Sequence, residues 1–102
     1  MPGNTKHTHQ YDPKEYKFLE FEKSSTAHKK YDAILENKKT HETVKVPFGD
    51  KRYEQFEDAT GLGLYSNKDH HDEKRKESYH KRHAKEEGTK YSPGYFSLNY
   101  LW

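Results

Sequence analysis

The sequence predicts an α+β fold in which a small antiparallel three-stranded sheet is followed by a long polar helix and an aromatic C-terminal tail. Three observations support this prediction. Apolar and polar residues alternate between residues 43 and 48, strong helix formers fill residues 68–87, and the last twelve residues carry no charged side chain. The first pattern has the period of a half-buried strand, and the second has the composition of a helix.

The composition limits the chain to one small domain with a thin core. Its 102 residues are too few for two independent cores. Hydrophobic residues make up 28% and charged residues 35% of the sequence, whereas globular domains average about 45–50% apolar residues on a slightly broader set. Nine Tyr, five Phe and one Trp partly offset the deficit, because each aromatic ring buries about 150–250 Å². We therefore expect a core made mainly of rings.

A β-hairpin is the clearest predicted element. Every second residue from Val44 to Phe48 is apolar, which is typical of a strand with one buried face. We place the two strands at Lys30–Glu36 and Glu42–Phe48, joined by a polar loop of four to six residues. Pro47 has no backbone N–H group, so it indicates an edge strand or a strand end.

The first strand is less clearly marked. Asp12-Pro13-Lys14-Glu15 has the form of a helix start, with an N-cap acceptor and Pro at the first helical position. The alternation of Leu19 and Phe21 with Phe18, Glu20 and Glu22 instead favours a turn that leads into a strand at Lys17–Lys23. Residues 1–16 are predicted to be a flexible arm, and residues 17–102 a single domain.

A long helix is predicted at Lys68–Glu87. Ser66-Asn67-Lys68-Asp69 resembles a capping box, and Gly88 provides a stop signal. Asp72 with Lys76 and Glu77 with Lys81 form ion pairs at i, i+4 in the favourable order. The helix has almost no apolar stripe, since Tyr79 and Ala84 are its main candidates for burial. Such a helix bridges between bodies or docks through mixed contacts.

The C-terminal tail, Tyr91 to Trp102, reverses the composition. Five of its twelve residues are aromatic, and Leu98 and Leu101 add apolar surface. A segment of this kind has to pack against its own domain or against another molecule. We expect it to cover the sheet or to bind a neighbour.

Several classes of site have no support in the sequence. Without cysteine there are no disulfides or thiolate metal sites. No apolar run reaches the 18–20 residues of a membrane span, and the polar N-terminus does not resemble a secretory signal, so synthesis in a cytosol-like compartment is expected. Gly61-x-Gly63 lacks the third glycine of a dinucleotide fingerprint. We predict neither an enzyme nor a bound cofactor.

The histidines of the predicted helix raise a metal hypothesis. His80 and His83 share a helix face, and Glu77 or Glu87 could complete a zinc site. The His-Glu-x-x-His spacing is absent, and a charged helix carrying histidines is the favoured interpretation. A metal switch is kept as a third hypothesis.

The order of several motifs resembles a family of small basic proteins of large nucleocytoplasmic DNA viruses, such as the chlorella-virus and mimivirus groups. The motifs are Lys29-Lys30-Tyr31-Asp32-Ala33, the strand end Phe48-Gly49, Tyr53-Glu54-Gln55-Phe56, the run from Asp72 to His83, and the closing Gly94 to Trp102. The likeness covers about residues 20–102 and depends on order and spacing. It implies a virion-associated or minor capsid role.

The function expected from these observations is that of a structural virion protein that bridges or cements larger capsid subunits. Its partners would be the major capsid protein and other minor capsid proteins, and its location the virion capsid, after synthesis in the host cytoplasm. Interface energy is concentrated in Tyr, Trp and Arg. The predicted partner-binding residues are Arg75, Tyr79, Arg82 and His83 on the helix, with Tyr95, Phe96, Leu98, Tyr100 and Trp102 as anchors.

Nucleic-acid binding is the alternative function. Basic residues cluster in helix residues 74–83, where Tyr79 could stack on a base. The overall net charge is only +2, and acidic residues are interleaved along the same helix. An acidic protein surface is therefore the favoured partner of this segment.

Overall fold

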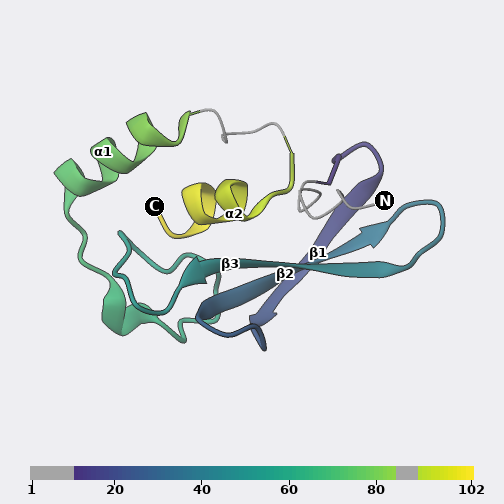
Figure 1. Ribbon diagram of the computed structural model, residues 1–102, viewed down its shortest axis with the longest axis horizontal. Coiled ribbons are helices and arrows are strands. Elements are labelled where there is room, and N and C mark those ends of the chain that lie inside the picture. The colour runs from purple at the N-terminus through teal and green to yellow at the C-terminus, as the bar shows by residue number, and fades with distance from the viewer. Residues whose placement is uncertain (1–10, 85–89) are drawn as a thin grey trace.

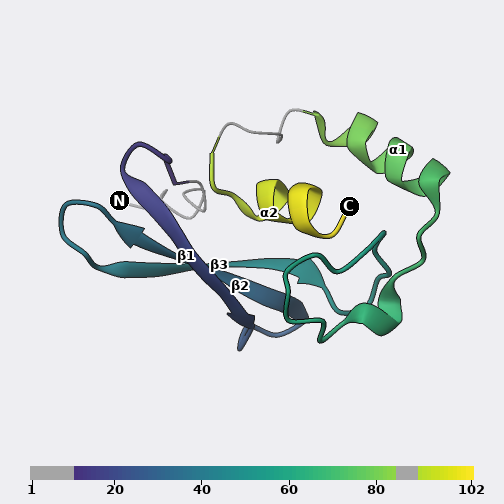
Figure 2. The ribbon, with the colours of Figure 1, turned by 180° about the vertical axis from the view of Figure 1, so that it is seen from behind.

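The computed structural model describes residues 11–84 and 90–102. Within them the chain forms a three-stranded antiparallel sheet of order β1-β2-β3, followed by two short helices. Both helices lie on the same side of the sheet, and α2 covers that face directly (Figures 1 and 2). The elements are β1 Tyr16–Lys23, β2 Lys29–Asn37, β3 Thr43–Asp50, a 3₁₀ turn Ser66–Lys68, α1 Glu73–Arg82 and α2 Pro93–Tyr100.

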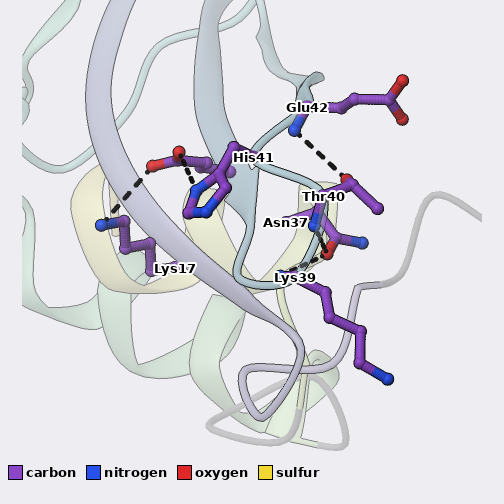
Figure 3. A network of polar contacts seen from close by, with 7 residues as sticks. Lys17, Asn37, Lys39, Thr40, His41 and Glu42 are labelled. Carbon is purple, nitrogen blue, oxygen red and sulfur yellow. Dashed lines mark hydrogen bonds and ion pairs between the residues drawn. The ribbon is translucent and has the colours of Figure 1, made fainter.

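The predicted hairpin and all three predicted strands are confirmed. β2 pairs with β3 from Lys29 opposite Asp50 to Glu36 opposite Thr43, and Pro47 lies in an edge strand as expected. Figure 3 shows how the loop between these strands is closed. The Asn37 Oδ1 atom accepts hydrogen bonds from the backbone N–H groups of the second and third residues after it, at 2.8 and 3.0 Å. This Asx-type turn fixes the register of the hairpin.

A β-bulge changes which side chains of β1 face the core. The register shifts between Phe18 and Glu20, so the regular alternation of Leu19 and Phe21 with Phe18, Glu20 and Glu22 is interrupted. Phe18 and Phe21 instead lie together, with ring centroids 4.7 Å apart, and Leu19 remains 44% exposed. A bulge sets two residues opposite one. It thereby brings two phenylalanines onto the core face.

The C-terminal tail folds back as α2 and closes the core. The helix begins with Pro93 in its first turn, and the Ser92 hydroxyl oxygen accepts a hydrogen bond from the Tyr95 N–H group at 3.1 Å. Phe96 is buried between the rings of Phe21 and Phe48, with centroids 5.9 and 5.5 Å away. Of the two expected positions for the tail, the structure has the one over the sheet.

The helix predicted at Lys68–Glu87 is shorter than expected. α1 begins at Glu73 because the Asp72 carboxylate caps it and accepts hydrogen bonds from the N–H groups of residues 74 and 75. Residues 69–72 are not helical, since Asp69 forms a β-bridge with Gln55. Residues 85–87 of the prediction lie outside the described residues. The misleading signal was the capping-box pattern at Ser66, because this residue is the first of the 3₁₀ turn Ser66–Lys68, whose N-cap residue is Tyr65 and provides no side-chain cap.

The folded domain extends further toward the N-terminus than the predicted boundary at residue 17. Tyr11 and Tyr91 exchange two backbone hydrogen bonds of 2.9 Å each. The Tyr11 ring packs edge-on against Tyr16, with centroids 4.9 Å apart. Residues 11–16 are thus part of the domain, and residues 1–10 of the predicted arm lie outside the described residues.

Gly49 is predicted to be intolerant of any side chain. Its φ of +77° favours glycine, and an added Cβ would lie 2.9 Å from the Leu101 Cδ1 atom and 3.2 Å from the Lys30 Cβ atom. Both the backbone strain and the overlap should oppose folding. We expect Gly49→Ala to lower the free energy of unfolding by about 2 kcal/mol or more in urea titrations.

Gly61→Ala is the matched control, because Gly61 has a φ of +89° but no atom within 4 Å of an added Cβ. It should show the backbone cost alone, about 1 kcal/mol. Equal losses for the two variants would contradict the role of Gly49 in the close approach of Leu101.

Candidate functional site

A buried lysine holds the segment before α1 against the sheet. Lys30 is 1% exposed. Its Nζ atom donates hydrogen bonds to the backbone oxygen of Tyr53, at 2.9 Å, and to the side-chain oxygen of Gln55. Burial, followed by the nearby charge of Lys68, lowers the pKa of Lys30 to about 8. A buried cation is tolerated only when its donors are satisfied, and here they fix segment 53–55.

Gln55, which accepts a hydrogen bond from Lys30, also binds the chain that leads into α1. Its Nε2 group donates to the backbone oxygen of Tyr65 at 2.8 Å and to the Asp69 carboxylate at 2.6 Å. The backbone of Gln55 adds two hydrogen bonds. Its carbonyl oxygen accepts from the His70 N–H group at 2.9 Å, and its N–H group donates to the Lys68 carbonyl oxygen at 3.1 Å. The start of α1 is therefore placed by polar contacts rather than by apolar packing.

Tyr31, which is buried, and Asp58, which is partly buried, form a second polar pair. The Tyr31 hydroxyl donates to the Asp58 carboxylate and accepts a hydrogen bond from the Leu64 N–H group at 2.9 Å. Burial, together with the neighbouring Asp58, raises the pKa of Tyr31 to about 12. These contacts tie the loop at residues 58–64 to the central strand.

α1 is attached to the rest of the domain through its own polar and aromatic side chains. The Tyr79 ring stacks on the Trp102 ring with centroids 4.3 Å apart and an angle of 3° between the planes. Arg75 makes an ion pair of 2.9 Å with Glu54, and the Lys76 ammonium lies 4.5 Å from the centre of the Phe56 ring. None of the residues of α1 is buried. The helix thus rests on the surface of the domain.

The outward side of α1 carries a basic face, defined here as Lys74, Arg75, Ser78 and Arg82. These residues line an open hollow of about 320 Å³. Lys74, Ser78 and Arg82 are exposed and follow one another at intervals of four residues, so they share one side of the helix. Among residues 11–84 and 90–102, no carboxylate lines this hollow. Three cations around a hydroxyl are suited to bind carboxylate or phosphate groups.

The structure separates the predicted partner-binding residues into three groups. Arg75 and Arg82 lie together on the basic face. Tyr79 and His83 lie on another side of α1, where their rings stack with centroids 4.2 Å apart. The predicted anchors are distributed over the core and its margin: Phe96 and Leu98 are buried in this chain, whereas Tyr95, Tyr100 and Trp102 are partly buried at the margin.

Two exposed leucines form an apolar feature that the sequence analysis did not identify. Leu62 and Leu64 are 44% and 50% exposed, in the segment that contains Gly61 and Gly63. The sequence does contain a signal for them. Only 28% of the residues are hydrophobic, yet two leucines alternate with glycines at residues 61–64. Exposed apolar side chains in such a chain mark a candidate contact.

In residues 11–84 and 90–102, no group of three or more His, Asp or Glu side chains is arranged to hold a metal ion. None of the helices in that part of the chain is long and apolar enough to cross a membrane. Comparisons of the chain with protein-family models, curated proteins and solved structures find no match.

Removing the Trp102 ring should release α1 while leaving the sheet folded. Stacked ring pairs contribute about 1 kcal/mol beyond their buried area, which corresponds to about a fivefold change in an opening equilibrium. We expect Trp102→Leu to raise amide hydrogen exchange at least fivefold in residues 73–82, with little change in β2. Unchanged exchange in α1 would show that the stack does not hold the helix.

His70 links the docking of α1 to pH. Its Nδ1 atom accepts a hydrogen bond from the Asp72 N–H group at 2.8 Å, so this nitrogen carries no proton. Its ring lies near Trp102, with centroids 5.1 Å apart. Burial chiefly, and the charge of Arg75, lower the pKa of His70, while Asp72 and Glu54 oppose the shift and His71 adds to it.

Stability should therefore fall as the pH drops from about 6.5 through the lowered pKa of His70, because the unfolded chain binds the proton more readily there. Urea unfolding at pH 7.5 and pH 5 measures this loss. In His70→Gln, whose amide oxygen can still accept from Asp72, the difference between the two pH values should be smaller. An unchanged difference would exclude His70 as its source.

Proposed function

We propose that this protein is a structural virion component, a minor capsid protein that bridges or cements larger capsid subunits. The order of its motifs, which resembles that of small proteins of large DNA viruses, supports a virion role. Its partners would be the major capsid protein and other minor capsid proteins. Recognition of protein surfaces, rather than catalysis, accounts for the features described above.

The observation that carries the proposal is the position of α1. All of its residues remain outside the core, yet ring stacking, an ion pair and a cation–π contact hold it in one place. A helix presented in this way contributes little to the core. It is better explained as a surface for a partner, and its basic face fits an acidic patch on a capsid subunit.

Apolar contacts would complement this charged surface. Leu62 and Leu64 are two of the four exposed large hydrophobic residues in the described part of the chain, and the partly buried Trp102 lies beside α1. Interfaces combine an apolar centre with a polar rim. The proposed anchors therefore shift from Phe96 and Leu98, whose side chains fill the core of this chain, to these more accessible residues.

Nucleic-acid binding is the second candidate, and the makeup of the basic face favours it. Lys74, Arg75 and Arg82 surround a hydroxyl, and no carboxylate from the described part of the chain is among the lining residues, although acidic residues are frequent along the helix. Such a group can contact two neighbouring phosphates without reading bases. If phosphates are the ligand, affinity for DNA will fall steeply with rising salt concentration.

Reversing charge on the basic face tests the capsid proposal. We expect Lys74→Glu/Arg82→Glu to reduce incorporation into assembled particles at least tenfold, because a protein partner with an acidic patch would then be repelled. Quantitative immunoblotting of purified particles provides the measurement. The exchanged side chains are exposed, so the fold should persist, which circular dichroism can verify.

The matched control is Lys14→Glu/Lys39→Glu, which makes the same charge change at exposed positions away from α1. Incorporation of this control should equal that of the unmodified chain. Normal incorporation of the α1 variant would overturn the proposed surface. Binding of the unmodified chain to capsid subunits with no response to DNA would favour the protein partner over the nucleic acid.

A further inference from the structure

Ser78 lies at the centre of the basic face. It is exposed, and it lines the same hollow as Lys74, Arg75 and Arg82. Lys74 and Arg75 precede Ser78 by four and three residues, and Arg82 follows it by four. All three are therefore within reach of its side chain along the helix. A hydroxyl among three cations is a favourable position for an added phosphate.

The sequence distinguishes Ser78 from every other serine and threonine of the chain. It alone has an arginine three residues before it, namely Arg75. Lys74 and Lys76 make the same stretch more basic. Kinases that select basic substrates recognise this arrangement, because a guanidinium pairs well with carboxylates in the substrate groove.

We propose that Ser78 is a phosphorylation site for an arginine-directed serine kinase. In the reaction, the Ser78 Oγ atom forms a bond to the γ-phosphorus of ATP while the bond to the ADP oxygen breaks. The hydroxyl proton goes to the catalytic base of the kinase, and ADP leaves. The effect on assembly described below rests on the proposed function, whereas the modification site itself does not.

The helix can open to admit a kinase. Kinases take their substrates in extended form, so a segment around Ser78 has to leave the α-helical conformation. α1 buries none of its residues, so this local opening exposes no core side chain. Segments with few buried contacts open at low free-energy cost.

A phosphate at Ser78 would remove most of the net positive charge of the basic face. It carries a charge of about −1.5 to −2 at neutral pH, which offsets most of the three positive charges around it. It would also compete for Arg75, which now pairs with Glu54 at 2.9 Å. Phosphorylation would therefore weaken binding of this face to any anionic partner and loosen one attachment of α1.

The modification is tested with the full chain, a purified arginine-directed serine kinase and MgATP. Mass spectrometry should find one phosphate per chain, located at Ser78, and none in Ser78→Ala. Thr26 serves as an internal comparison, because it has a lysine, Lys23, three residues before it where Ser78 has an arginine. Absence of phosphate at Ser78, or its placement elsewhere, would overturn the proposal.

The environment of the phosphate is tested by ³¹P NMR of the chain that carries phosphoserine at position 78. The second pKa of a solvated phosphoserine is about 6, and the three cations should lower it by about one pH unit, since they favour the dianion. In Lys74→Ala/Arg82→Ala the value should return toward 6. A value of 6 in both proteins would show that the basic face does not hold the phosphate.

These two readouts use no capsid partner, so they can fail or succeed independently of the proposed function. A third measurement joins them: the phosphorylated chain should be incorporated into particles at least tenfold less than the unmodified chain. Ser78 could be phosphorylated, with a lowered second pKa of its phosphate, while incorporation into particles is unchanged. That result would overturn the effect on assembly but would leave Ser78 established as the phosphorylation site.

Discussion

The packing of α2 against the open apolar face of the sheet is the constraint on which the rest of the structure depends. Phe96 and Leu101 occupy the centre of the core. The Leu101 carbonyl oxygen accepts hydrogen bonds from the N–H groups of Phe56 and Glu57 at 3.0 and 3.1 Å. Trp102, the next residue, stacks on Tyr79 and so locates α1. The sheet, the loop and α1 therefore all depend on how the C-terminal segment is seated.

Buried polar contacts compensate for the shortage of apolar residues. Lys30, Gln55 and Asp69 connect the central strand to the chain before α1 through hydrogen bonds. Such contacts add modest net stability but are costly to break, because an unpaired buried polar group has lost its hydration. The network thus specifies one position for the loop more than it strengthens the fold.

This division of labour leaves α1 available for binding. The sheet and α2 supply the core, and the polar layer fixes the approach to the helix, so the exposed side of α1 is not needed for folding. Selection on that side can then act through recognition alone. The same reasoning accounts for a hydroxyl among three cations at Ser78, where a change of charge would alter binding without disturbing the core.

Local periodicity determined the strands of this protein. Alternation from Val44 to Phe48 was enough to place a strand, and the missing N–H group of Pro47 limited it to an edge position or a strand end, because both signals are properties of neighbouring residues. The bulge that turns Phe18 and Phe21 to one face, the helical form of the tail and the start of α1 at Glu73 were decided by tertiary structure. Each depends on partners distant in sequence, such as Phe96 against Phe48 and Gln55 against Asp69. The basic face lies between these cases: its spacing is visible in the sequence, but its exposure follows from the side of α1 that Trp102 covers.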